Sequence, residues 1–172
     1  MSQSTNGLRQ HCTAQLRIDS PLGALLLART AAGLAGAWFD GQKHHPGELT
    51  APVEPTDPLL CRAADQLRRY FAGEAVCFDL PLDLQGTPFQ RAVWLALVDI
   101  DTGTTQSYAA IARRIGSTSA VRAVGGAIGR NPVSVIVPCH RVIGSDGSMT
   151  GYAGGIDRKL ALQSLERATL PA

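Results

Sequence analysis

The sequence lacks several features that would assign it to a specialised class of protein. It has no stretch approaching the roughly 18 consecutive apolar residues that suggest a membrane-spanning helix. Its first residues, MSQSTNGLRQH, are polar and contain no apolar core of a signal peptide. Charged residues make up 17% of the chain and apolar residues 45%, which is typical of an ordinary globular protein. These properties predict a cytoplasmic protein without a membrane partner.

Cysteine is also scarce, and its spacing excludes two common uses of the residue. In an intracellular chain, four cysteines without a C-x-x-C pair argue against a disulfide framework and against a standard zinc knuckle. The adjacent pairs His11-Cys12 and His44-His45 lack a partner motif, so surface histidines and buried, inert cysteines are the favoured interpretation. The four cysteines are Cys12, Cys61, Cys77 and Cys139. The sequence therefore predicts no metal.

The charges are distributed unevenly between the two halves of the chain. Residues 1–84 contain 7 Lys and Arg against 9 Asp and Glu, whereas residues 85–172 contain 9 against 5. A weakly basic second half is compatible with a polyanionic partner, although a solvated surface explains the bias equally well.

The first half has the pattern of a small sheet followed by one helix. Residues 14–39 form three strand-like segments separated by the turns SPLG and TAAG, and residues 40–56 have the composition of a loop. A helix is predicted to begin after the cap Asp57 and to end at Gly73. Residues 76–84 then predict an extended connection to a second domain.

The second half predicts a helix followed by a pair of short helices. Thr87 caps a helix with an apolar stripe of Phe89, Val93, Trp94, Leu97 and Val98. A helix from Ser107 to Gly116, a turn at 117–119 and a helix ended by Asn131-Pro132 then make a helix-turn-helix arrangement. Such pairs also occur in plain helical packing, so this pattern alone leaves nucleic-acid binding open.

The second helix of that pair has almost no side-chain bulk. Arg122 is its one long charged side chain, whereas a helix that reads the major groove usually carries several polar side chains. A thin helix suits close approach to a nucleic-acid backbone or to a narrow minor groove. Its small residues are Ala120, Ala123, Gly125, Gly126, Ala127 and Gly129.

Residues 132–144, PVSVIVPCHRVIG, place three chemically active groups in an apolar segment. The β-branched residues predict a strand from Pro132 to Ile143, with Cys139, His140 and Arg141 inside it. Burying such groups is costly unless they have partners. A last helix is predicted over about 157–168, with Leu160, Ser164 and Leu165 near one face and Glu166 beside them.

The PCHRV segment and several blocks around it resemble one family. Together with DSPLG, GTPFQRAVW, SYAAIA, AVRAVGGA and GYAGGIDRK, it is similar, in the same order, to the O6-alkylguanine-DNA alkyltransferases, also called methylated-DNA–protein-cysteine methyltransferases. The resemblance covers about 13–168. It implies an α+β fold of two domains. Residues 1–84 would form a ribonuclease-H-like α/β domain with a linker, and residues 85–172 a winged helix-turn-helix domain that carries the active site.

The resemblance also implies a mechanism. Members of the family flip an alkylated guanine out of duplex DNA and transfer its O6-alkyl group irreversibly to one cysteine, in a single turnover without a cofactor. Cys139 matches the acceptor, and His140 matches the histidine that takes the thiol proton through a water. Glu166 matches the glutamate that orients this imidazole, so the three resemble a nucleophile–base–acid triad.

Other positions carry over one at a time. Asn131 matches an asparagine that braces the turn before the active site, Tyr108 a tyrosine that serves the flipped base and its 3′ phosphate, and Arg122 the arginine that replaces the extruded base. The remaining predicted DNA-binding residues are Ser107, Ala120, Ala123 and Gly125. The predicted substrate pocket comprises Ile128, Ser134, Val142, Tyr152, Ala153 and Gly154. Ala153 replaces a serine, and Ser134 a proline, of some relatives.

The predicted partner is double-stranded DNA containing O6-alkylguanine, bound through the minor groove by a monomer without an obligate protein partner. Three alternatives remain. A non-catalytic lesion binder of this fold would lack the acceptor cysteine, which is present here. A winged-helix regulator would not need a buried Cys-His-Glu set, and a cysteine hydrolase would need an oxyanion hole and turnover.

Overall fold

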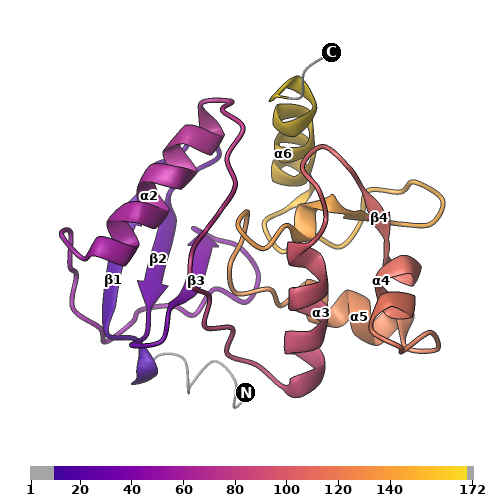
Figure 1. The fold of residues 1–172 in the computed structure, drawn as a ribbon, viewed down its shortest axis with the longest axis horizontal. Helices are drawn as coiled ribbons and strands as arrows, with labels where there is room; N and C mark the ends of the chain where they lie inside the picture. Colours follow the sequence, from indigo (N-terminus) through magenta and orange to yellow (C-terminus); the bar gives the residue numbers. More distant parts are fainter. Residues whose placement is uncertain (1–9, 170–172) are drawn as a thin grey trace.

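A computed structural model describes residues 10–169 (Figure 1). In the first half, a three-stranded antiparallel sheet in the order β1-β2-β3 is covered on one face by a helix. These elements are β1 (Ala14–Ile18), β2 (Leu25–Arg29), β3 (Leu34–Phe39) and α2 (Pro58–Phe71). The polar N-terminus, and the outer limits of the predicted domains at residues 1 and 172, lie outside the described range.

The register of the sheet aligns its apolar side chains under α2. Leu25 lies opposite Ile18 on one side and Phe39 on the other, and all three pack in the main core with Leu60 and Leu67 of α2. The opposite face is covered by a smaller cluster of Cys12, Ala28, Ala35, Trp38 and Ala51. Because β3 is covered on both faces, all six of its residues are buried.

The helix boundaries in the first half follow the predicted caps. Asp57 Oδ1 accepts a hydrogen bond from the Leu60 backbone N–H at 3.0 Å, and Pro58 begins α2. Gly73, which follows the helix, has a φ of +84°, a left-handed conformation that glycine adopts without steric cost. The predicted helix is therefore confirmed at both ends.

The second half contains the predicted group of three helices. They are α3 (Pro88–Val98), α4 (Tyr108–Arg114) and α5 (Val121–Ile128). Thr87 and Gln90 form a capping box at the start of α3, and Ser107 Oγ accepts from the Ala110 N–H at 3.1 Å at the start of α4. The predicted stripe of α3 holds for Val93, Trp94 and Leu97, but Val98 is 43% exposed.

The predicted strand from Pro132 to Ile143 is wrong. The segment turns repeatedly, and it includes a 3₁₀ helix, η1 (Cys139–Arg141), and a two-residue strand, β5 (Val142–Ile143). Two prolines remove backbone donors from the segment, and Val135 has a left-handed φ of +72°, which is rare for a β-branched residue. Strand β5 pairs in parallel with β4 (Gln106–Ser107). Burial against other elements has overridden the β-propensity of these residues.

The predicted face of the last helix, α6 (Ile156–Thr169), is also wrong. Leu160 is 43% exposed, and Leu165 is only partly buried. The buried positions of α6 are Lys159, Leu162, Gln163 and Glu166, three of them polar. An apolar stripe could not indicate this face, because the polar groups on it have partners from other elements.

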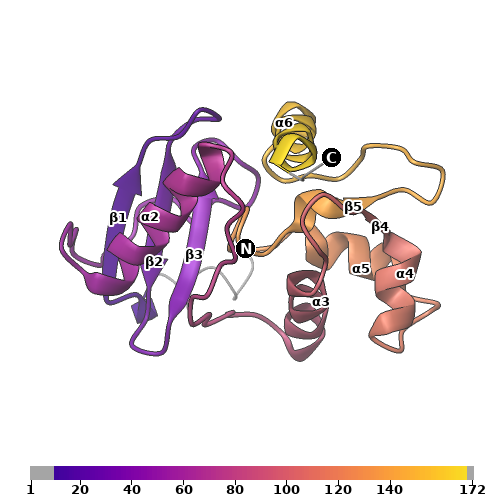
Figure 2. The same ribbon diagram turned by 45° about the horizontal axis from the view of Figure 1, so that its top comes forward.

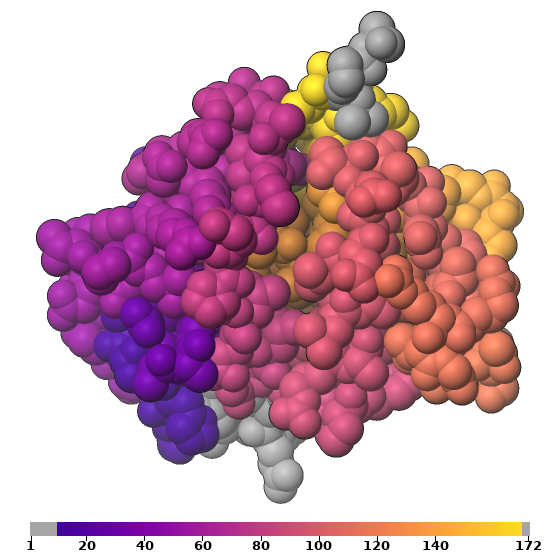
Figure 3. Space-filling model, viewed as in Figure 1, coloured from indigo at the N-terminus to yellow at the C-terminus, as the bar shows by residue number. Residues whose placement is uncertain are grey.

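The two halves are joined through the edge of the first sheet (Figure 2). The Ala37 N–H of β3 donates to the Pro132 carbonyl at 2.9 Å, and the Ser134 N–H donates to the Ala37 carbonyl at 2.8 Å. The segment before η1 is therefore hydrogen-bonded to the first half. Figure 3 shows the surface hollowed between the magenta and salmon parts of the chain, with atoms of the orange segment visible inside. No helix within residues 10–169 is long and apolar enough to cross a membrane.

Trp94 holds α5 in place, and its removal is expected to destabilise the fold. Its indole Nε1–H donates to the Ala127 carbonyl at 2.8 Å, and its side chain is 2% exposed. We expect Trp94→Phe to lower the free energy of unfolding by about 1–3 kcal/mol, because a buried acceptor loses its donor and a cavity opens. Leu95→Ala, at a neighbouring position that is 58% exposed, should change it by less than about 0.5 kcal/mol. Urea unfolding measures both, and equal losses would contradict this role of Trp94.

Candidate active site

The three groups Cys139, His140 and Arg141 lie on η1, between Pro138 and β5. All three are buried, with exposed fractions of 4%, 0% and 6%. The Cys139 N–H donates to the Val137 carbonyl and the Arg141 N–H to the Pro138 carbonyl, which fixes the tight turn. On this turn, unlike on a strand, the three side chains need not alternate between two faces of a sheet.

Glu166 of α6 is the acceptor at the centre of the site. Its carboxylate is 2% exposed and accepts from His140 Nε2 at 2.7 Å, from Arg141 Nη2 at 2.8 Å and from Arg141 Nε at 3.0 Å. The Gly103 N–H donates to the same carboxylate at 3.2 Å, and the Tyr70 hydroxyl at 2.8 Å. Arg141 also donates to the Ile100 carbonyl and to Thr102 Oγ1. The predicted association of Glu166 with His140 is present, and Arg141 forms a buried ion pair.

These contacts determine the charge of the glutamate. Burial alone would raise the pKa of Glu166, but the hydrogen bonds and charges of His140 and Arg141 lower it far below its usual value. The carboxylate is therefore ionised at neutral pH. Arg141 offsets most of its charge, so the buried group is close to electrically neutral overall.

The ionised glutamate also fixes the proton on the imidazole. A carboxylate is only an acceptor, so His140 Nε2 must carry the proton in this hydrogen bond. Burial lowers the pKa of His140, although the hydrogen bond and charge of Glu166 raise it, so the ring is neutral at pH 7. Its Nδ1 is therefore an unprotonated acceptor, and it is buried without a hydrogen-bond partner among the described residues. Such an atom can take up a proton.

Cys139 is held by Asn131, as its predicted bracing role requires. The Asn131 Nδ2 donates to Cys139 Sγ at 3.0 Å and to the Val137 carbonyl at 2.8 Å, while its Oδ1 accepts from the Val133 N–H at 3.0 Å. Burial raises the pKa of the Cys139 thiol to about 11, although Asn131 and the charge of Lys159 lower it. The thiol is thus protonated at neutral pH and needs a base before it can act as a nucleophile.

Lys159 and Tyr108 both contact the loop that lies between β5 and α6. Lys159 Nζ is buried and donates to the Val142 carbonyl and, at 2.8 Å, to the Thr150 carbonyl. The Tyr108 hydroxyl donates to the same Thr150 carbonyl at 2.8 Å. These bonds tie α6 and α4 to the loop that precedes Tyr152.

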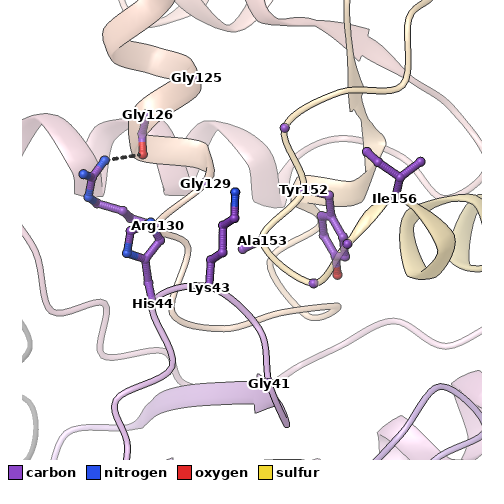
Figure 4. A pocket seen from close by; sticks show the side chains of 13 residues that line it. Gly41, Lys43, His44, Gly125, Gly126, Gly129, Arg130, Tyr152, Ala153 and Ile156 are labelled. Carbon is purple, nitrogen blue, oxygen red and sulfur yellow. Dashed lines mark hydrogen bonds between the residues drawn. The ribbon is translucent and has the colours of Figure 1, made fainter.

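A cavity of about 580 Å³ is lined in part by Tyr152, whose buried hydroxyl lies near enough to Cys139 to feel its charge, while Cys139 and His140 do not line it (Figure 4). Three of the predicted pocket residues line it, namely Tyr152, Ala153 and Gly154, and so does the predicted DNA-binding residue Gly125. The other three predicted pocket residues do not line it. Ile128 and Val142 lie in the core with Cys139, and Ser134 Oγ donates to Gln42 Oε1 at 3.0 Å.

One wall of this cavity consists of residues that no motif of the sequence indicates. Lys43 and His44, from the loop after β3, and Arg130, after α5, also line it. The Lys43 N–H donates to the Ala153 carbonyl at 3.0 Å, so this loop contacts the loop of Tyr152. A sequence signal for this contact was absent, because the segment GQKHH has only the composition of a loop.

The predicted DNA-binding residues lie at the starts of α4 and α5 and along α5, and all of them reach the surface. Arg122 and Ala123 are exposed, and Ser107, Ala120 and Gly125 are partly exposed. A Cβ added at Gly125 would meet only the Tyr108 ring, at an ordinary 3.7 Å. Packing within the protein therefore does not require glycine at this position.

The other cysteines and the histidine pairs form no centre of their own. Cys12 is buried, as expected for the cysteine of the His11-Cys12 pair, whereas Cys61 and Cys77 are exposed. Across residues 10–169, no group of three or more His, Cys, Asp or Glu side chains is placed to hold a metal ion.

Almost the whole chain is similar to proteins of one family. Residues 16–84 match the family described as 6-O-methylguanine DNA methyltransferase, ribonuclease-like domain, and residues 88–168 match its DNA binding domain. The chain is 49% identical over 155 residues to the methylated-DNA–protein-cysteine methyltransferase of Mycobacterium tuberculosis, covering 90% of this chain and 93% of the relative. It is 47% identical over 154 residues to that of Methanosarcina barkeri, covering 89% and 96%.

Solved structures agree with these sequence matches. The crystal structure of the M. tuberculosis O6-methylguanine methyltransferase superimposes with a TM-score of 0.83 at 48% identity, covering 92% of this chain and 95% of that one. A structure of the M. tuberculosis protein in complex with DNA gives a TM-score of 0.82, with coverage of 92% and 96%. These matches confirm the predicted α+β fold of two domains. The chain belongs to the 6-O-methylguanine DNA methyltransferase family.

Proposed function

We propose that this protein repairs O6-alkylguanine in DNA by transferring the alkyl group irreversibly to its own Cys139, once per molecule. The observation that carries the proposal is the buried set of Asn131, Cys139, His140 and Glu166, near which the loop of Tyr152 lines an open cavity. Asn131 holds the thiol, and Glu166 holds the imidazole with Nδ1 free to accept a proton. A non-catalytic lesion binder would not need this set.

The chemistry follows from the protonation states of these groups. The thiol proton moves to His140 Nδ1 through a bridging water, and the resulting imidazolium is stabilised by Glu166. The Cys139 thiolate attacks the alkyl carbon, so that a sulfur–carbon bond forms as the carbon–O6 bond breaks. The electron pair of the broken bond stays with the base, which takes up one proton and becomes guanine. The thioether has no route back to a thiol, so each molecule reacts once.

The proposed substrate position is the cavity beside Tyr152, Ala153 and Gly154. With alanine at position 153, the protein offers no side-chain hydroxyl there, so backbone N–H groups of this loop would meet the guanine oxygen. We assign Tyr108 to the flipped nucleotide and its 3′ phosphate, because Tyr108 lies beside Gly125 at the base of this loop. Ile128, Ser134 and Val142 are assigned to the buried surroundings of Cys139.

The proposed partner is double-stranded DNA, bound through its minor groove by α4 and α5. The support is a thin outer helix face with one exposed arginine, on which glycine is not required by internal packing. Residues 85–172 would bind DNA and carry out the transfer, and residues 1–84 would support them. We propose that the protein acts as a monomer and without a cofactor. The proposed location is the cytoplasm.

The proposal is tested by weighing the protein after reaction with O6-methylguanine DNA. We expect a gain of one methyl group on the peptide that contains Cys139, and no second turnover. Cys139→Ser should show no gain, because a serine hydroxyl is a far poorer nucleophile than a thiolate, while still binding the lesion. Methyl transfer to the serine variant, or turnover by the wild type, would refute this assignment of the acceptor.

The rate of transfer should depend on pH through His140. Because burial lowers the pKa of His140, its neutral, proton-accepting form persists below its ordinary value near 6.5. The single-turnover rate should therefore stay flat as pH falls through 6.5 and decline only in more acidic solution. Tryptophan fluorescence should show that the protein is still folded at these pH values.

His140→Ala provides the matched comparison. Without the base, transfer should slow by about 10²- to 10⁴-fold at neutral pH. Its rate should instead rise about tenfold per pH unit as the thiol ionises toward its pKa of about 11. A variant with the pH profile of the wild type would show that His140 is not the base.

Arg122 is proposed to fill the space left by the flipped nucleotide. Extrusion from a duplex costs a few kcal/mol, which the inserted guanidinium partly offsets, whereas a single strand has little stacking to lose. Arg122→Ala should therefore slow repair in a duplex much more than in a short single strand, in single-turnover assays on both. An equal loss on the two substrates would identify Arg122 as a simple phosphate contact, whose removal makes the salt dependence shallower.

A further inference from the structure

Tyr70 of the first half reaches into the centre of the site described above. It lies near the end of α2, is 4% exposed, and its hydroxyl contacts Glu166 Oε1 at 2.8 Å. Figures 1 and 2 both show the end of α2 beside α6. Since the ionised carboxylate is only an acceptor, the tyrosine is the donor in this hydrogen bond.

The position of this hydroxyl is fixed by packing. The Tyr70 ring lies against Phe71, with centroids 5.5 Å apart, and against Phe78, with centroids 5.6 Å apart. Phe78 belongs to the extended connection that follows α2. A ring held on two sides presents its hydroxyl in one place, which makes it a preorganised donor.

The carboxylate oxygen that Tyr70 contacts is the one that His140 uses. Glu166 Oε1 accepts from Tyr70 at 2.8 Å, from His140 Nε2 at 2.7 Å and from Arg141 Nη2 at 2.8 Å. A donor on this oxygen draws electron density away from the bond to His140 and holds the carboxylate in one orientation. The strength of that bond determines how readily the imidazole accepts a proton.

We propose that Tyr70 is a positioning residue for alkyl transfer, which acts through Glu166 to set the basicity and orientation of His140. The inference rests on the function proposed above, and it gives the first half of the chain a part in the chemistry. The charged and titratable groups around Glu166 are Tyr70 from α2, His140 and Arg141 from η1, and Lys159 on the same helix, whose charge also acts on His140. Tyr70 is the member of this set that the first half supplies.

Tyr70→Phe removes the hydroxyl and retains the ring. Because the carboxylate, and with it the imidazole, is then held less firmly in one orientation, we expect the single-turnover rate of methyl transfer at neutral pH to fall about threefold to tenfold. With one donor fewer, Glu166 becomes a stronger acceptor for His140 and the imidazole becomes more basic. The acidic limb of the pH–rate profile should therefore move to higher pH, by about half a unit. Leu60→Ala, near the start of α2, is the control, since it loosens the packing of the same helix but leaves the Tyr70 hydroxyl and its ring contacts in place. It should lower Tm without moving the acidic limb.

A double-mutant cycle with His140→Ala tests the route of the effect. If Tyr70 acts through Glu166 on His140, Tyr70→Phe should leave the residual rate of His140→Ala unchanged. Multiplying losses, or an acidic limb that stays in place, would overturn the proposal and leave Tyr70 as a packing residue.

An NMR titration of the His140 ring, without DNA, keeps this test separate from the test of the function. It should show a raised imidazole pKa in Tyr70→Phe even if the wild type transfers no methyl group, in which case only the proposed function fails. Should Tyr70→Phe not fold, 3-fluorotyrosine placed at position 70 gives a stronger donor on the same ring, and the His140 pKa should then fall. An unchanged pKa in the folded variant would refute the proposal.

Discussion

The ion pair between Arg141 and Glu166 is the interaction on which the rest of the site depends. Both side chains are buried, and a buried charge without a partner is strongly destabilising. Their pairing lets a carboxylate remain ionised inside the core, and only an ionised carboxylate obliges His140 to carry its proton on Nε2. The free Nδ1, and with it the possibility of taking a proton from Cys139, follows from that pair.

The same pair explains why distant parts of the chain meet at one point. Glu166 accepts hydrogen bonds from α2, from the loop at Gly103 and from η1. Among the described residues, no polar side chain of α6 itself donates to it. Each hydrogen bond holds the element of its donor against α6, so the carboxylate connects elements that are distant in the sequence. Satisfying one buried charge thus joins the first half of the chain to the active site.

Burial also protects the thiol that is proposed to accept the alkyl group. A thiol with a pKa of about 11 is almost entirely protonated in the resting protein, and a protonated, buried thiol reacts slowly with oxidants. The exposed Cys61 and Cys77 lack this protection and have no place in the proposed chemistry. In the proposed reaction the thiol therefore becomes a nucleophile only when His140 takes its proton.

The local parts of the fold could be predicted from the residues themselves, whereas the long-range pairing of Glu166 with His140 could be predicted only from the family resemblance. Caps such as Asp57, Thr87 and Ser107 act within a few residues, so the helix boundaries that they set are visible in the sequence. The predicted strand over 132–143 was wrong, because burial and two prolines, and not β-propensity, determine the backbone conformation of this segment. The contact of Tyr70 with Glu166 could not be predicted, because the two residues lie 96 positions apart and no local pattern links them.

The composition of α5 shows the same balance between local and distant constraints. Glycines at 125 and 126 weaken a helix of only 8 residues by about 1 kcal/mol each relative to alanine, and its own cap supplies no side-chain hydrogen bond. The helix persists because Val124 and Ile128 are buried and because Trp94 of α3 donates to the Ala127 carbonyl. Its inner face thus supplies the stability that its outer face lacks. That outer face is left thin, which is the property that the proposed close approach of a DNA backbone to α5 requires.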